Sequence, residues 1–294
     1  MAATSESEPM VSELKDVRVE GKEKENLPFF RENLDPYLPS ETKDMLETYS
    51  KIPREQQSEH IHKIRDMAWN LRAWPCIGLG TWLTPQLRRQ SFYPEILERV
   101  NAGAVLMDIG TFIGHDIRRL VYEGAPSKNL YGVDIANHFE TGYECFQDRD
   151  TFKGHFIEAD FLNPDASPEL AALKNSKVDI IVISQVLHQW SLAHQLTAAK
   201  ALVEFTKPGT WIVGNQIGHP IAQEGTTSGI SSRIYSHNPE TFAKMWDDAG
   251  AATGTKWETE AKTRAFGSFG FDEKDMDFLK TGHIVLEFRV KRLE

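Results

Sequence analysis

The chain has 294 residues, of which 40% are hydrophobic and 26% charged, as is typical of globular proteins. Its net charge of −10 argues against a nucleic-acid partner, because a phosphate backbone would be repelled. No apolar run approaches the roughly 18 residues of a membrane helix, and two cysteines are too few for a disulfide framework. The polar, charged residues 1–26 lack the apolar core of a signal peptide and predict a disordered tail. We therefore expect a cytoplasmic protein without a membrane partner.

Residues 27–100 predict an N-terminal helical cap. Within them, residues 59–71 place Ile61, Ile64, Ala68 and Leu71 at helical spacing, which indicates an amphipathic helix. Pro75 interrupts the helical pattern, and residues 91–100 predict a second helix that leads into the rest of the chain. We expect a core over residues 101–294.

In the core, strands alternate with helices. The expected parallel strands are residues 104–110, 129–135, 155–161, 178–187 and 208–217, and the most apolar of these, 178–187, should be central. A last helix over 238–254 begins with Asn238 and Pro239. Residues 255–266 and 283–293 predict two more strands, and their connection is short for a parallel crossover. The predicted fold class is α/β: a Rossmann-like, seven-stranded, mostly parallel sheet with an antiparallel last strand, plus the helical cap.

Polar residues end four successive predicted strands. Asp108 and Asp134 end the first two, Asp160 the third, and residues 184–188 the fourth. Ligands of open α/β sheets bind beyond these strand ends. A dinucleotide loop would need the pattern G-x-G-x-x-G, but here Phe112 stands between the two glycines, and Asp108 would repel a diphosphate. The carboxylates instead favour a cationic ligand, and S-adenosylmethionine has positive sulfonium and ammonium groups and no phosphate.

Each strand-end residue has an expected role in binding this cofactor. Asp134 would accept hydrogen bonds from the ribose hydroxyls. Asp160 would accept from the adenine amino group, and Phe161 would offer its backbone amide, although acids after strands also cap helices. Glycines let the backbone approach a ligand closely. The expected cofactor-binding residues are Asp108, Gly110, Gly114, Asp134, Ile135, Asp160, Phe161 and Ser184.

The pattern D-x-G-x-x-x-G, the acids of the next two strands and VLHQW after the fourth resemble class I S-adenosylmethionine-dependent methyltransferases. That family usually has acid-x-G-x-G-x-G, and Phe112 replaces the middle glycine. A closer resemblance is to fungal methyltransferases of meroterpenoid and polyketide biosynthesis. It rests on HIHKIRDMAW and PCIG, on IGHDIRRLVYEGAPSKNLYGVDI and on NPETFAKMWDDAGAATGTKW. The resemblance implies methylation of a carboxyl or an enol or phenol hydroxyl on a terpenoid, meroterpenoid or polyketide in fungal secondary metabolism.

His188 is the candidate catalytic residue, since it ends the central strand near the expected methyl group. Its imidazole could deprotonate a hydroxyl; alternatively it only positions the acceptor, because a carboxylate is already ionised at pH 7. Residues 219–238 are polar and contain glycine, as expected of a substrate loop or lid, although a solvated loop would look the same. The candidate substrate-binding residues are His60, Trp82, Gln185, Arg233 and His237.

Two absences narrow the class further. No N-P-P-[YF] pattern follows the fourth strand, as it often does in enzymes that methylate amino groups, and no paired acids stand there, so we expect no metal. A cofactor-binding scaffold that catalyses a cyclisation or serves as a non-catalytic module is the alternative function. A nicotinamide-dependent oxidoreductase is disfavoured by the missing glycine pattern. We expect a small-molecule acid or hydroxyl acceptor as partner, and a homodimer through the aromatic N-terminal region.

Overall fold

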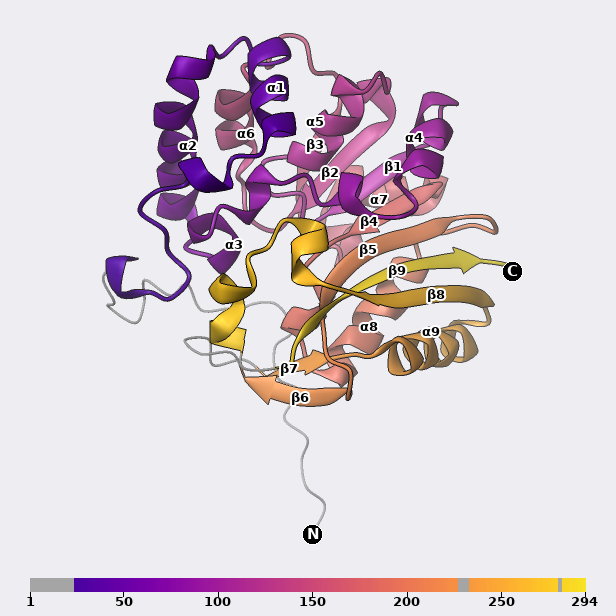
Figure 1. The fold of residues 1–294 in the computed structure, drawn as a ribbon. Helices are drawn as coiled ribbons and strands as arrows, with labels where there is room; N and C mark the ends of the chain where they lie inside the picture. Colours follow the sequence, from indigo (N-terminus) through magenta and orange to yellow (C-terminus); the bar gives the residue numbers. More distant parts are fainter. Residues whose placement is uncertain (1–23, 227–232, 280–281) are drawn as a thin grey trace.

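A sheet of seven strands runs through the molecule in the order β3-β2-β1-β4-β5-β9-β8 (Figure 1). A computed structural model describes residues 24–226, 233–279 and 282–294, so most of the predicted tail lies outside the described residues. The strands are β1 (Leu106–Ile109), β2 (Leu130–Asp134), β3 (His155–Glu158), β4 (Ile180–Ile183), β5 (Trp211–Gly218), β8 (Trp257–Arg264) and β9 (Ile284–Arg292). Strands β1 to β5 pair in parallel, and β9 is antiparallel to both of its neighbours. The predicted fold class is confirmed, including the antiparallel last strand.

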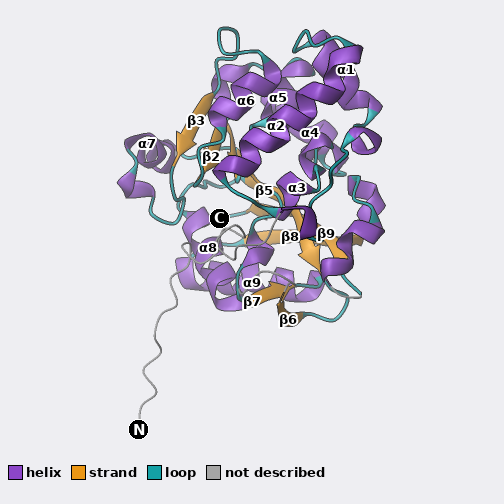
Figure 2. Cartoon of the chain, turned by 90° about the vertical axis from the view of Figure 1, so that its left-hand side faces the viewer, coloured by secondary structure: helices purple, strands orange, loops and turns teal. Residues whose placement is uncertain are grey.

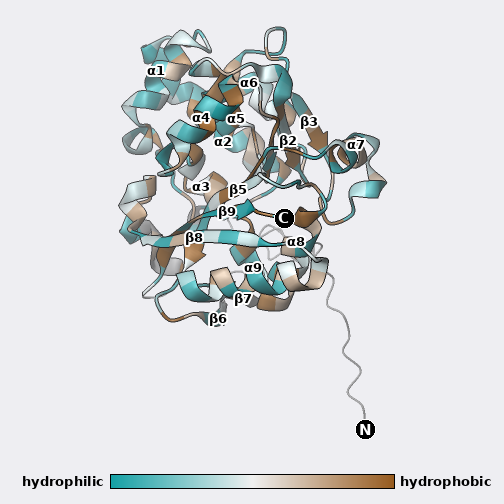
Figure 3. Ribbon diagram, turned by 90° about the vertical axis from the view of Figure 1, so that its right-hand side faces the viewer, coloured by the Kyte–Doolittle hydropathy of each residue, from teal (hydrophilic) through white to brown (hydrophobic). Residues whose placement is uncertain are grey.

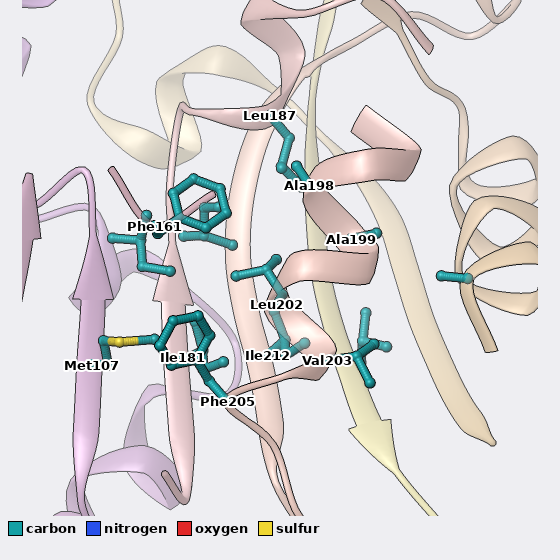
Figure 4. Close-up of a cluster of buried hydrophobic side chains, with 14 of the residues drawn as sticks. Met107, Phe161, Ile181, Leu187, Ala198, Ala199, Leu202, Val203, Phe205 and Ile212 are labelled. Atoms are coloured by element: carbon teal, nitrogen blue, oxygen red, sulfur yellow. The ribbon is translucent and has the colours of Figure 1, made fainter. Parts of the chain in front are cut away.

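Helices cover both faces of the sheet. On one side lie α4 (Tyr93–Asn101), α5 (His115–Tyr122) and α6 (Phe139–Phe146); α7 (Pro168–Ser176), α8 (Leu192–Val203) and α9 (Pro239–Thr253) complete the other. Every residue of β1 and β4 is buried, because alternate side chains pack into opposite layers. Met107 and Ile181 join the cluster that includes α8 (Figure 4), whereas Leu106 and Val182 pack against α4 and α5.

Besides α4, the described part of the chain before β1 contains the α-helices α1 (Ser40–Thr48), α2 (Gln57–Leu71) and α3 (Pro75–Gly78). Helix α2 packs against α6 (Figure 2) and buries Ile61, Ile64 and Ala68 as its spacing predicts. The prediction was wrong for Leu71, which is 52% exposed because it is the last residue of the helix. Helix α1 was not predicted, since only Met45 and Leu46 of its nine residues are buried and no apolar period marks it.

The sequence predicted strand β8 at the sheet edge, but it did not predict the two strands in the segment after β5. Strand β8 is hydrophilic (Figure 3), and its charged residues keep an exposed edge soluble. Residues 219–238 are not simply a loop: β6 (Gln223–Thr226) and β7 (Arg233–Ser236) form an antiparallel pair. Helix α9 begins at Pro239, as expected, and the side chain of its N-cap residue Asn238 forms a capping box with Thr241. No helix in the described part of the chain is long and apolar enough to cross a membrane.

Candidate functional site

Two adjoining cavities lie at the carboxyl ends of the parallel strands. The larger has a volume of about 220 Å³ and the smaller about 70 Å³. The two share five lining residues: Trp74, Gly110, Asp134, Val186 and Gln189. Ligands of open α/β sheets bind at this edge, so the strand-end positions that the sequence singles out converge on one connected space.

The loop after β1 has an unusual backbone at three positions. Gly110, Phe112 and Gly114 have φ of 74°, 54° and 69°. A Cβ on Gly110 would lie 2.6 Å from Val186 Cγ2, so this glycine permits close packing of the loop on the end of β4. Phe112 adopts the left-handed conformation that a glycine would take more easily, at a cost of about 1–2 kcal/mol.

The Phe112 side chain both packs and lines the larger cavity. Its ring centroid is 4.8 Å from that of His138 and 6.3 Å from that of Trp82, edge-on in both cases. These contacts favour the ring by about 0.5–1.5 kcal/mol each beyond its burial, which offsets the backbone strain. The residue that replaces the family's middle glycine therefore keeps the loop's conformation and links it to the N-terminal segment.

Asp134 is buried and held by backbone amides. Phe112 N donates to Oδ2 at 2.8 Å, and Ala136 N donates to Oδ1 at 2.9 Å. Burial raises the pKa of this carboxyl to about 6, although the amides oppose the shift. It is therefore mainly ionised at pH 7, and each oxygen keeps a lone pair for a further donor.

Asp108 and Asp116 lie in the larger cavity. Asp108 accepts a hydrogen bond from Thr111 Oγ1 at 2.7 Å, and burial, with the nearby Asp116, raises its pKa well above the usual range. Asp116 accepts from Leu87 N at 3.1 Å, and burial raises its pKa too. No lysine or arginine is among the described residues that line this cavity. Buried carboxyls that have no cation beside them in a cavity attract a cationic ligand.

Asp116 was not predicted. An acid two residues after the second glycine, in the first turn of the helix, could have suggested it.

The smaller cavity contains the expected residues of the second and third strand ends. Asp134, Ile135, Asp160 and Phe161 line it, together with Arg72. Asp160 Oδ1 accepts from Leu162 N at 2.9 Å, while Phe161 is buried against the core.

Gly114 lines neither cavity. It is the N-cap of α5, where a Cβ would lie 2.6 Å from Phe156 Cζ. This glycine therefore serves the packing of α5 on the sheet and does not border the space for a ligand.

The end of β4 brings Ser184, Gln185 and His188 to the larger cavity. Gln185 has φ of 58°, and its amide donates to Asn215 Oδ1 of β5, which fixes the turn. Burial, with the nearby His283, lowers the pKa of His188 to about 3, so its imidazole is neutral at pH 7. His188 Nδ1 is buried and has no hydrogen-bond partner among the described residues.

The other predicted substrate-binding residues fall in different places. Trp82 lines the larger cavity. His60 does not line either cavity: it lies on the side of α2 that faces α6, and its Nε2 is 2.9 Å from Cys145 O. His237 also lines neither cavity, because it is fully buried at the start of α9, with Nδ1 3.0 Å from Thr241 Oγ1. Arg233 begins β7, and its side chain lies outside what the structure describes.

Sequence reasoning missed most of the cavity's apolar lining. These residues come from the residue after α3, from β5 and β7, and from the connection between β8 and β9, so no local pattern joins them. They are Leu79, Ile217, Ile234, Phe271, Met276 and Leu279. Across the described ranges, no group of three His, Cys, Asp or Glu side chains is arranged to hold a metal ion.

The strand order, the antiparallel β9 and the acids at successive strand ends define a class I S-adenosylmethionine-dependent methyltransferase. Residues 29–83 match the family described as meroterpenoid methyltransferase N-terminal domain. The 1,6-didemethyltoxoflavin-N1-methyltransferase of Burkholderia thailandensis shares the fold with a TM-score of 0.50 at 10% sequence identity, covering 83% of this chain and 92% of that one.

Curated fungal relatives are much more similar in sequence. O-methyltransferase phiE from a fungal species is 34% identical over 81% of this chain and 80% of the relative. The asnovolin E/chermesin D methyltransferase nvfJ of Aspergillus novofumigatus is 34% identical over 74% of this chain and 79% of the relative. The chain belongs to this family of fungal S-adenosylmethionine-dependent methyltransferases, as its sequence motifs predicted.

Proposed function

We propose that the protein is an O-methyltransferase that acts on a carboxyl or an enol or phenol hydroxyl of a terpenoid, meroterpenoid or polyketide in fungal secondary metabolism. One observation carries the proposal: a cavity lined by buried carboxyls, with no lysine or arginine in its described lining, continues directly into an apolar wall. The names of the relatives support the acceptor class, since one is an O-methyltransferase and another acts on asnovolin E and chermesin D.

The residues at the strand ends fit S-adenosylmethionine, which supplies an electrophilic methyl group on a cationic sulfur. We assign the ribose hydroxyls to Asp134, whose oxygens are oriented by two amides and still accept. Asp160 and Phe161 would hold the adenine in the smaller cavity, beside Ile135. Asp108 and the loop at Gly110 would hold the methionine end, and Ser184 would border it.

On the acceptor side, the residues exclude water and orient an oxygen. The apolar wall of Leu79, Ile217 and Phe271 lowers the local polarity, which favours a reaction in which charge is lost as the methyl group moves. His188 is neutral, and its Nδ1 has no hydrogen-bond partner among the described residues, so the imidazole can donate to a carboxylate or accept from a hydroxyl. A carboxylate needs no base, and a nitrogen with so low a pKa is a weak one. We therefore assign His188 to positioning the acceptor, with Trp82 and Gln185 beside it.

We further propose that residues 27–100 act as a helical cap on a cofactor-binding core of residues 101–294. Leu79 and Trp82 of the cap line the larger cavity, which supports this division. A cytoplasmic location, a homodimer and the absence of a metal or nucleic-acid partner remain part of the same proposal.

Calorimetry and methyl transfer test the function. S-adenosylmethionine should bind to the purified full chain, and NADPH should not. Labelled S-adenosylmethionine should then transfer its methyl group to at least one member of a panel of terpenoid acids, phenolic acids and pyrones. Affinity for NADPH alone would overturn the cofactor assignment. Tight binding of S-adenosylmethionine without transfer to any acceptor would favour the scaffold function instead.

A further inference from the structure

Asp116 is a buried carboxylate in the larger cavity, outside the glycine-loop pattern. It is 5% exposed, and one of its oxygens accepts from Leu87 N at 3.1 Å. The other oxygen lies 3.8 Å from His115 Nε2, too far for a hydrogen bond. Burial lowers the pKa of His115, so this imidazole does not supply a counter-charge at pH 7.

The surroundings of Asp116 inside the cavity add a second carboxyl. Arg119 also acts on Asp116, but it lies outside the described lining and donates to Glu123 and to Glu41 O. Asp108 lines the same cavity, and its side chain accepts a hydrogen bond from the neutral hydroxyl of Thr111. The described lining of the cavity contains no lysine or arginine. Two buried carboxyls with no lysine or arginine beside them in the cavity are costly unless a bound cation joins them.

Gln86 independently indicates a ligand with donor groups. It directly precedes Leu87, whose amide holds Asp116, and it lines the same cavity. Its Nε2 donates to Phe269 O at 3.0 Å, which fixes the side chain at 6% exposure. Its Oε1 is buried without a hydrogen-bond partner in the described part of the chain. A buried acceptor of this kind is costly unless a bound donor satisfies it.

We propose that Asp116 and Gln86, together with Asp108, form a cation subsite that makes the protein bind S-adenosylmethionine more tightly than S-adenosylhomocysteine. The proposal rests on the cofactor assignment above. S-adenosylmethionine has two positive centres, the sulfonium and the ammonium, whereas the product has only the ammonium. Loss of the sulfonium charge therefore weakens attraction to these carboxylates and favours product release. Because Gln86 belongs to residues 27–100, the N-terminal segment also completes the cofactor site.

Calorimetry on the full chain tests this with the variant Asp116→Asn and three ligands: S-adenosylmethionine, S-adenosylhomocysteine, and sinefungin, in which a protonated amine replaces the charge at sulfur. Asparagine can still accept from Leu87 N. We expect affinity for the first and third ligands to fall about tenfold, and affinity for S-adenosylhomocysteine to fall less than about threefold. Gln86→Leu should weaken binding of all three, because all three carry the ammonium that Gln86 Oε1 would accept from. The control is Asp150→Asn, which removes an exposed charge and should change none of the affinities.

Equal losses for S-adenosylhomocysteine and for the two ligands with a charge at the sulfur position in Asp116→Asn, with a lowered melting temperature, would mean that Asp116 only supports the fold. That result, or unchanged affinities, overturns the subsite. Failure of the wild-type chain to bind any of the three ligands would instead overturn the cofactor assignment. The two failures are therefore distinguishable.

Discussion

The larger cavity has two walls built on different principles. We call the first the strand-end wall; it comprises Asp108, Gly110, Asp134, Ser184 and Gln185. Asp108 and Asp134 lie at the ends of β1 and β2, and Gly110, Ser184 and Gln185 directly follow β1 and β4. Backbone or side-chain hydrogen bonds fix several of them. We call the second the apolar wall; it comprises Leu79, Ile217, Ile234, Phe271, Met276 and Leu279. Packing holds these residues, and they come from segments far apart in the sequence.

The difference between the two walls matches two requirements of a methyltransferase: to bind a cofactor that is always the same and to bind a particular acceptor. Polar groups with fixed hydrogen bonds suit a cofactor that is the same in every reaction, since a small displacement would leave buried charges unpaired. An apolar wall tolerates exchange of one side chain for another of similar volume. We therefore expect the apolar wall of this protein to contact the acceptor and the strand-end wall to contact the cofactor.

The largest expected effect comes from disturbing the backbone of the strand-end wall. In Gly110→Ala, the left-handed φ of 74° and a Cβ 2.6 Å from Val186 Cγ2 should together lower the free energy of unfolding by about 3 kcal/mol. Gly124→Ala is the matched control: its φ is 104°, but its Cβ would meet no atom within 4 Å, so only the backbone cost of about 1–2 kcal/mol applies. Urea unfolding measures both, and equal losses would show that close packing at Gly110 is unimportant.

A smaller but more specific effect is expected from Asp108→Asn. Its carboxyl would be lost as a partner for a cation, while the bond with Thr111 Oγ1 can be kept. We expect cofactor affinity to fall about 30- to 100-fold, or about 2–3 kcal/mol, with the KM for the acceptor little changed. Calorimetry and steady-state kinetics check this. A change confined to the acceptor KM would show that Asp108 acts on the acceptor and not on the cofactor.

The strand-end wall could be predicted from the sequence because its members lie at the ends of apolar strands. Asp108, Asp134 and Asp160 each end a strand that is visible in the pattern, and parallel strands bring their ends to one edge. Asp116 was missed although it lies in the same segment, because an acid in a first helical turn is common for electrostatic reasons alone.

The apolar wall could not be predicted in this way. Phe271 and Met276 lie in a connection without helical or strand period, and they meet Leu79 only through the tertiary fold. For a related reason, the sequence could not show that His60 and His237 lie outside the lining of the cavity. His60 and His237 lie on elements near the cavity, but the sequence does not determine which way their side chains point, and both are turned into packing contacts.

The affinity for the cofactor should depend on pH because Asp134 changes from its charged to its uncharged state as the pH falls. Its pKa of about 6 means that lowering the pH from 7 to 5 protonates most of this carboxyl, so cofactor affinity should fall about tenfold through this group. The pKa values of His138 and His188 are lowered to about 4 and 3, so these residues stay neutral over this range. Calorimetry at several pH values should give a flatter profile for Asp134→Asn. An unchanged profile in that variant would assign the titration to Asp108 or Asp116.

The smallest expected effect tests the apolar wall. Phe271 lines the larger cavity and packs against Phe266, with ring centroids 6.2 Å apart. In Phe271→Leu the wall stays apolar but loses ring surface, so we expect the acceptor KM to rise about fivefold, equivalent to about 1 kcal/mol. The affinity for S-adenosylmethionine should stay within about twofold of the wild-type value, because no atom of the strand-end wall is altered. Phe266→Leu is the matched control, since it removes the same ring contact from a residue outside the described lining. If both variants raise the acceptor KM equally, the effect belongs to packing of the segment and not to contact with the acceptor. If Phe271→Leu weakens binding of the cofactor as much as binding of the acceptor, then the two walls do not each serve a different ligand.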